Sequence, residues 1–372
     1  MKILYNCQQG TFCDMRTTSR DVSVVTRQPL LNAILDEDYR AEIYIPFNMD
    51  KPEALAPDIQ KLVDEDPLAK ALWINNNSTS AKISVKTRFI NPSDLTKMKF
   101  DLAITELRTK LYFHDSIPND VALQRKIWKL NCPKIIWDMD MWLGDELPYF
   151  YKESEQLEFA KVITPTSDYY MYLSSLPKKY KANELHWEHV DFPPSIPIDW
   201  TSKPEFDLGY VGSQYNREDS FHRFITSVAK ADPTLKIEVI GKWYDNVKSL
   251  CPPNITFSSA RTPMFLAPWH LNKYAATIQI APKYYQLTGT HTYRLAEGLT
   301  YGPVLYTDSA IKGVEKHVPP FSLVRTPEEL TAQLNEDKSP DTRRYKVDAQ
   351  KSYISTLGEW SSLAKKLLKP ID

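Results

Sequence analysis

Short runs of apolar and β-branched residues recur along the chain, and stretches of helical or loop character separate them. Runs of this kind are typical of buried parallel strands that helices connect. The pattern predicts strands at 2–6, 42–46, 100–105, 134–137, 161–164, 206–211, 237–241, 276–280 and 303–306. It also predicts helices at 20–35 and 218–231, and one or two closing helices in the last thirty residues. The expected fold class is therefore α/β.

A proline-rich segment divides this pattern into two halves. Four prolines fall within residues 192–204, and proline disrupts both helices and strand ladders. The strand–helix alternation restarts after it, so we expect Rossmann-like, doubly wound domains at 1–191 and 206–345, a linker at 192–205 and closing helices at 346–372. Two such domains would hold a ligand in the cleft between them, beyond the carboxyl ends of the strands. One large α/β domain with a decorated sheet is the alternative.

The composition is that of an ordinary globular protein. The 372 residues are 42% hydrophobic and 25% charged, which excludes the disordered and fibrous classes. No run of 18 apolar residues is present, and the N-terminus lacks the pattern of a secretory signal, so we expect a cytoplasmic monomer with no membrane partner. Four scattered cysteines are too few for a disulfide framework or a zinc site.

Charge and glycine are distributed unevenly between the halves. Residues 1–200 hold 24 Lys and Arg against 29 Asp and Glu, whereas residues 201–372 hold 22 against 18. Seven of the ten glycines lie between Gly209 and Gly313. Because glycine lets a backbone approach a ligand closely, the basic second half is the expected place for a phosphate-rich ligand.

Residues 210–217, Tyr-Val-Gly-Ser-Gln-Tyr-Asn-Arg, form a predicted strand-to-helix turn. Backbone N–H groups at the start of a helix attract anions. Gly212 permits close approach, Ser213 adds a hydroxyl donor, and Arg217 can contact phosphate oxygens with two donors. The turn therefore indicates a phosphate site, and the alternative is a simple helix cap.

Arg294 and Glu297 are three residues apart, so they share one face of a predicted helix. The pair suits a nucleotide, because the guanidinium can meet phosphate while the carboxylate accepts from both ribose hydroxyls. A surface ion pair, worth about 0–1 kcal/mol, is the alternative. The apolar flanks Leu295 and Leu299 and the buried-looking strand that follows favour the ligand site.

Two carboxylates, Asp138 and Asp140, follow the predicted strand 134–137 among Trp and Met residues. Apolar neighbours raise the pKa of a carboxylate toward the range of a general base. A helix cap or a loop without metal is an equal alternative. The Asp-x-Asp spacing also fits a divalent cation such as Mg²⁺ or Mn²⁺, so the need for metal stays open.

Together these residues resemble the T-even phage DNA β-glucosyltransferase family. The second half carries motifs in the family's order: Tyr-x-Gly-Ser at 210–213, Arg-Glu-x-Ser at 217–220, a strand ending at Gly241, Pro-Met at 263–264 and Arg-x-x-Glu at 294–297. In the first half, Asp140 with the following Met-Trp-Leu fits the family's catalytic Asp. The resemblance implies a GT-B-type fold, with two Rossmann-like domains facing across a cleft. The first would bind the acceptor and the second the nucleotide sugar.

The residues implied to bind the UDP-sugar donor all lie in the second half: Gly212, Ser213, Arg217, Gly241, Arg261, Thr262, Tyr285, Arg294 and Glu297. The first three would hold the diphosphate, and the next three would bracket the uracil. Tyr285 and Arg294 would reach phosphate oxygens, and Glu297 the ribose hydroxyls. The family has a second glycine and an extra Arg in the diphosphate turn, where this chain has Val211 and Tyr215.

On the acceptor side, the resemblance implies that Asp140 deprotonates the hydroxyl that attacks the anomeric carbon, with inversion. Asp138 and Trp142 would lie beside it, Trp142 standing where the family has an Arg. The implied acceptor is double-stranded DNA with a hydroxymethylated pyrimidine, as in the family's transfer of glucose onto 5-hydroxymethylcytosine. The protein would then be phage-encoded and act in the host cytoplasm.

The acidic first half contrasts with the basic face that duplex DNA favours. A local patch of Lys178, Lys179 and Lys181 would supply positive charge. The aromatic residues Trp142, Tyr149 and Tyr151 could stack on a flipped nucleotide, or they are core residues. Two other functions stay open: the same donor chemistry on a lipid, glycan or protein, and a nucleotide- or DNA-binding module without catalysis. The sequence leaves the transferred sugar undetermined.

Overall fold

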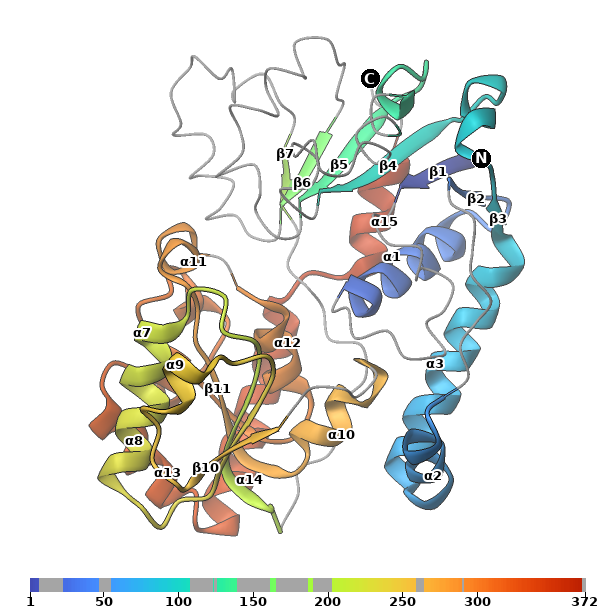
Figure 1. Ribbon diagram of the computed structural model, residues 1–372. Coiled ribbons are helices and arrows are strands. Elements are labelled where there is room, and N and C mark those ends of the chain that lie inside the picture. Colours follow the sequence, from blue (N-terminus) through green and yellow to red (C-terminus); the bar gives the residue numbers. More distant parts are fainter. Residues whose placement is uncertain are drawn as a thin grey trace. The chain divides into compact units, whose positions relative to one another are not determined.

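The computed structural model describes residues 1–6, 23–46, 55–107, 123, 126–138, 161–164, 187–189, 203–258, 264–289 and 291–369. Contacts divide the chain into two compact units (Figure 1), namely Met1–Asp191 with Glu359–Asp372, and Phe192–Gly358. Residues 192–202, most of the predicted linker, lie outside the described residues. Across the described ranges, no helix is both long and apolar enough to cross a bilayer.

In the described part of the first unit, seven parallel strands form one sheet in the order β3-β2-β1-β4-β5-β6-β7. Their bounds are β1 Lys2–Asn6, β2 Glu42–Ile45, β3 Thr87–Phe89, β4 Leu102–Leu107, β5 Lys134–Asp138, β6 Lys161–Thr164 and β7 Trp187–His189. The central strand β1 buries Ile3, Leu4 and Tyr5 completely. Burial on both faces explains why this strand is a continuous apolar run.

Helices of the first unit connect and cover these strands. They are α1 (Ser23–Glu37), α2 (Pro57–Glu65), α3 (Pro67–Lys86), the short 3₁₀ helix η2 (Pro92–Lys97) and α15 (Trp360–Leu368). The helix α15 comes from the end of the chain and packs against α1. An ion pair between Lys365 Nζ and Glu37 Oε1, at 3.6 Å, accompanies this contact. The last helix therefore completes the first unit rather than the second.

The second unit, within its described residues, holds six parallel strands in the order β10-β9-β8-β11-β12-β13. Their bounds are β8 Phe206–Val211, β9 Ile237–Ile240, β10 Ile255–Ser258, β11 Tyr274–Gln279, β12 Val304–Asp308 and β13 Leu323–Val324. The helical segments are α7 (Glu218–Phe221), the π-helical η6 (His222–Thr226), α8 (Ser227–Ala231), α9 (Asp245–Lys248), η7 (Met264–Leu266), α10 (Ala267–Leu271), α11 (Lys283–Thr288), α12 (Tyr293–Thr300), η8 (Val314–Lys316), η9 (Pro320–Ser322), α13 (Pro327–Glu336), α14 (Pro340–Lys351) and η10 (Ser352–Thr356).

Both sheets follow the strand order of the Rossmann fold. Renumbered within each unit, the first six strands run 3-2-1-4-5-6, which is the doubly wound order of dinucleotide-binding domains. The first unit adds β7 at one edge. The predicted α/β class with two doubly wound sheets is confirmed.

The helix predicted at 218–231 is confirmed and illustrates how the core forms. Phe221, Phe224, Ile225 and Val228, spaced at i, i+3, i+4 and i+7, are all fully buried against the sheet. Residues 222–226 form a π-helical segment within it, which the apolar spacing does not reveal. On the same face, Leu208 of β8 belongs to this hydrophobic cluster.

Candidate functional site

The turn after β8 carries the first predicted phosphate-binding residues. Gly212 N–H donates to the carbonyl of Ile240 at 2.8 Å, and the Gly212 carbonyl accepts from Trp243 Nε1 at 2.8 Å. The next residues Tyr215 and Asn216 have φ angles of 29° and 55°. A positive φ is unfavourable for residues other than glycine. Backbone strain of this kind is concentrated at functional sites. The turn leads directly into α7.

Hydrogen bonds join this turn to the loop after β9. Ser213 Oγ accepts from Lys242 N–H at 3.1 Å, and Gln214 Oε1 accepts from Tyr244 N–H at 3.0 Å. Ser213 therefore still has its hydroxyl proton to donate to a ligand. Arg217 Nη1 donates to the Ser213 carbonyl at 3.2 Å, which folds its guanidinium back over the turn.

Two glycines let the ends of β8 and β9 approach each other. Gly241 has a φ of 149°, and a Cβ atom there would lie 2.2 Å from the carbonyl oxygen of Gly212. A Cβ atom on Gly212 would lie 2.6 Å from the hydroxyl oxygen of Tyr210. Gly241 is therefore required to be glycine both by packing and by its φ, and a side chain on Gly212 would press on Tyr210.

The second predicted constellation lies on α12. Arg294 Nη1 donates to Glu297 Oε2, and the side chains are 22% and 1% exposed. The alternative of a surface ion pair is therefore wrong. Burial raises the pKa of the Glu297 carboxyl, and the positive charge and hydrogen bond of Arg294 oppose this shift. Within the described part of the chain, the second oxygen, Glu297 Oε1, is buried without a hydrogen-bond partner.

An unpartnered buried acceptor is costly, and sites where it occurs in native structures call for an explanation. The hydroxyl of Thr292, the residue before α12, is likewise buried without a partner among the described residues. Leu295, Ala296 and Leu299 anchor α12 to the core, so the helix cannot simply rotate Glu297 into solvent. Glu297 Oε1 and the Thr292 hydroxyl are therefore left to hydrogen-bond with groups beyond the described residues.

The helix α11 carries Tyr285, which is buried. Gln286 fastens this helix to its surroundings by donating from Nε2 to Ser220 Oγ at 3.0 Å and to Asp308 Oδ2 at 3.2 Å. Burial raises the pKa of the Asp308 carboxyl, while the Ala310 N–H and Arg223 act to lower it. Gln286 thus joins α11 to α7 and to the carboxyl end of β12.

The structure brings together some of the predicted residues. Contacts group Gly212, Ser213, Arg217 and Gly241 at the carboxyl ends of β8 and β9, and pair Arg294 with Glu297. Because β8 and β11 are neighbours from which the chain proceeds in opposite directions, this edge contains the topological switch point where such sheets bind ligands. Arg261, Thr262, Asp140 and Trp142 lie outside the described residues. Asp138 ends β5, where its backbone pairs with Leu107.

Sequence reasoning missed Gln214, Trp243 and Gln286, which shape the site without a motif. The only available signal was their place just beyond the carboxyl ends of predicted strands. Among the described residues, no group of three or more His, Cys, Asp or Glu side chains is suited to hold a metal ion. The Mg²⁺ or Mn²⁺ site was predicted at Asp138 and Asp140, whose side chains lie outside this described part of the chain.

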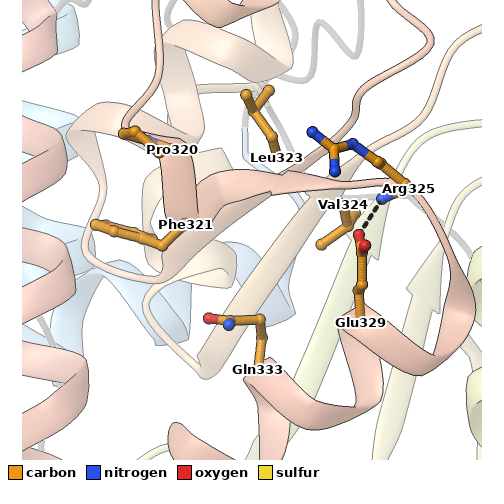
Figure 2. A pocket seen from close by; sticks show the side chains of 7 residues that line it. All are labelled: Pro320, Phe321, Leu323, Val324, Arg325, Glu329 and Gln333. Carbon is orange, nitrogen blue, oxygen red and sulfur yellow. Dashed lines mark hydrogen bonds between the residues drawn. The ribbon is translucent and has the colours of Figure 1, made fainter.

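A separate pocket of about 260 Å³ lies between β13 and α13 (Figure 2). It is lined by Pro320, Phe321, Leu323, Val324, Arg325, Glu329 and Gln333. Arg325 N–H donates to the Glu329 carboxylate at 2.7 Å at its rim. None of the predicted site residues lines this pocket, so it is distinct from the candidate site.

The fold and the site together define a class: an α/β protein of two Rossmann-order sheets, with a predicted phosphate-binding turn and a buried carboxylate in the second. No protein-family model matches the chain, and no curated protein matches it by sequence. Several solved structures, however, have a similar fold. A DNA-modifying β-glucosyltransferase, solved with and without uridine diphosphoglucose, is similar over 100% of both chains, with a TM-score of 0.65 and 17% identity.

Two further solved structures widen this comparison. T4 phage β-glucosyltransferase with UDP and Mn²⁺ is similar over 100% of both chains, with a TM-score of 0.65 and 16% identity. An α-glucosyltransferase with UDP and a 13-mer DNA containing an A:G mismatch matches 98% of this chain and 97% of its own, with a TM-score of 0.60 and 8% identity. The resemblance drawn from the sequence motifs is thus confirmed at the level of the fold.

Proposed function

We propose that this chain is a UDP-sugar-dependent glycosyltransferase that modifies a hydroxymethylated pyrimidine in DNA. The observation that carries the proposal is the buried Glu297 carboxylate, with one oxygen held by Arg294 and the other left open among the described residues. A nucleotide supplies the missing donors, because the ribose of UDP presents two adjacent hydroxyl groups. The full-length likeness to two DNA-modifying glucosyltransferase folds supports the same reading.

The residues proposed for the donor side lie in the second unit. The N–H groups after Gly212, the Ser213 hydroxyl and the Arg217 guanidinium would hold the diphosphate. Negative charge grows on UDP as it leaves, and donors fixed in advance stabilise that charge as it develops. Gly241, with Arg261 and Thr262, would bracket the uracil.

On the acceptor side, Asp140 follows the carboxyl end of β5 by two residues in the sequence. As a general base it would take the proton from the hydroxymethyl group while the oxygen attacks the anomeric carbon, and UDP would leave from the opposite face. That in-line path inverts the anomeric configuration. Since the similar folds include a β- and an α-glucosyltransferase, the stereochemistry of the product is a separate test.

The test is transfer of labelled sugar from a panel of UDP-sugars to duplex DNA with or without 5-hydroxymethylcytosine, read by mass spectrometry of the nucleosides. We expect transfer to the hydroxymethylated duplex alone. Asp140→Asn should abolish transfer while sparing UDP affinity, and the coupling constant of the anomeric proton should report inversion. Transfer to a lipid, glycan or protein only would overturn the DNA acceptor. Full turnover by Asp140→Asn would refute its role as the base.

A further inference from the structure

Gln350 of α14 is completely buried, and its side-chain amide makes three hydrogen bonds. Its Oε1 accepts from the N–H of Leu305 at 2.9 Å. Its Nε2 donates to the carbonyl of Pro303 at 2.8 Å and to the carbonyl of Gly298 at 3.0 Å. One side chain therefore ties together α14, the beginning of β12 and the last turn of α12.

The amide takes the place of a neighbouring strand. The partner strand β13 pairs with β12 only at Thr307 and Asp308, so it does not extend to the first residues of β12. There Gln350 accepts from one backbone N–H and donates to a carbonyl two residues earlier, as a peptide unit of a parallel strand does. Its other N–H satisfies Gly298, one of the last four helix residues, whose carbonyls have no partner inside the helix.

The contact between Gly298 and Leu305 fixes how closely α12 approaches the sheet. A Cβ atom on Gly298 would lie 2.6 Å from Leu305 Cδ1, so the helix rests directly on β12 where Gln350 clamps it. Glu297 immediately precedes Gly298, and its carboxylate has little freedom because Arg294 holds one oxygen. A movement of α12 relative to β12 would displace Glu297 Oε1 by a similar distance.

We propose that Gln350 is a positioning residue for the donor nucleotide, which acts by fixing α12 on β12 and so the open oxygen of Glu297. This inference rests on the proposed role of Glu297. Side chains that orient a binding residue without touching the ligand commonly change affinity by about tenfold or more.

The test compares Gln350→Leu, of similar size but without hydrogen bonds, with Val347→Ala on the same helix. Val347 is buried in the hydrophobic cluster and serves as the matched control for lost stability. UDP affinity is measured by calorimetry and the free energy of unfolding by urea titration. We expect Gln350→Leu to weaken UDP binding about tenfold and to raise KM for the sugar donor more than it lowers kcat. Val347→Ala should leave UDP affinity within about twofold.

A double-mutant cycle separates positioning from general loosening. In a Glu297→Ala background, Gln350→Leu should cost little further affinity, because its effect passes through the Glu297 carboxylate that this background lacks. Gly298→Ala, which presses on Leu305, is the milder second variant if Gln350→Leu does not fold, and it should weaken UDP binding in the same direction.

Three outcomes overturn the positioning role: UDP affinity within twofold of the wild type in both folded variants, an equal loss in Val347→Ala, or full additivity with Glu297→Ala. If Glu297→Ala itself leaves UDP affinity unchanged, the donor site assigned to Glu297 fails instead. The two failures are therefore distinguishable.

Discussion

Replacing Glu297 by alanine removes the buried carboxylate that carries the proposed nucleotide site of the second unit. The carboxylate is already buried and paired with Arg294 before any ligand arrives. Binding therefore does not have to strip water from it, and hydrogen bonds from ribose hydroxyls to Oε1 are gained almost in full. We expect Glu297→Ala to weaken UDP binding, and Glu297→Gln to do so less, because the amide keeps an acceptor oxygen but loses the charge.

The magnitude follows from the kind of hydrogen bond involved. Hydrogen bonds from the ribose hydroxyls to the charged carboxylate contribute about 1.5–3 kcal/mol to binding. The variant also leaves Arg294 without its ion-pair partner, and this offsets a part of the change in binding free energy. We therefore expect a loss of about 1–3 kcal/mol for Glu297→Ala, which is roughly five- to 150-fold in Kd. Glu297→Gln should lose about half of that free energy, since neutral hydrogen bonds are about half as strong.

Calorimetry with UDP and 2′-deoxy-UDP provides the assay. The wild type should discriminate against the deoxy ligand, whereas Glu297→Ala should bind both alike. Asp337→Asn is the matched control, because Asp337 is an equally buried carboxylate in an ion pair, with Lys346 rather than Arg294. UDP affinity within twofold of the wild type in Glu297→Ala, or retained discrimination against 2′-deoxy-UDP, would refute the reasoning.

Other consequences concern packing and protonation. Gly241→Ala would place a methyl group against the Gly212 carbonyl at a φ of 149°. Urea titration should therefore show a free energy of unfolding lower by about 1–3 kcal/mol, and UDP binding should weaken. An unchanged unfolding midpoint would contradict this prediction. Lys346 Nζ lies 2.8 Å from Asp337 Oδ1 in the interior. Lys346→Met would leave that carboxylate unpaired, so it should cost about 3–5 kcal/mol of stability without changing UDP affinity. A loss of stability below about 1 kcal/mol would count against this prediction. Burial raises the pKa of Glu297, so its carboxylate becomes protonated at a higher pH than an ordinary glutamate does. UDP affinity should therefore fall as the pH drops through this pKa, and the decline should disappear in Glu297→Gln. The folded chain binds that proton more tightly than the unfolded chain, so the same drop in pH should raise the stability contributed by this group.

The strands found from the sequence are the interior strands of both sheets. The apolar runs at 2–6, 42–46, 134–137 and 206–211 all correspond to strands with neighbours on both sides. Burial on both faces forces a continuous apolar run, and such a run is visible in a sequence. Within the described residues, the strands that escaped notice are β3, β7, β10 and β13, and each lies at the edge of its sheet. Edge strands are short and partly solvated, so they carry mixed side chains.

The candidate site divides along a similar line. Gly212, Gly241 and the pair Arg294–Glu297 were recognisable because each requirement is local: a close approach, a positive φ, or one helical turn. Gln350 was not, since its partners lie 45 to 52 residues away and an amide suits any exposed piece of backbone equally well. Its value to the site comes from where tertiary packing leaves β12 without a neighbour. A residue of this kind becomes visible only when the unpaired edge is known.

The two sheets share one strand order, yet the chemistry assigned to them differs, and glycine explains why. A Rossmann sheet binds a diphosphate only if the chain leaving its first strand can turn tightly and bring backbone N–H groups to the ligand. In the second unit Gly212 and Gly241 allow such a tight turn, because their backbones pack closely against each other. Only Gly10 and Gly144 occur in the first 200 residues, so the first unit has few places for such a turn. This difference fits the proposed division of tasks, with the base Asp140 in the first unit and the donor site in the second.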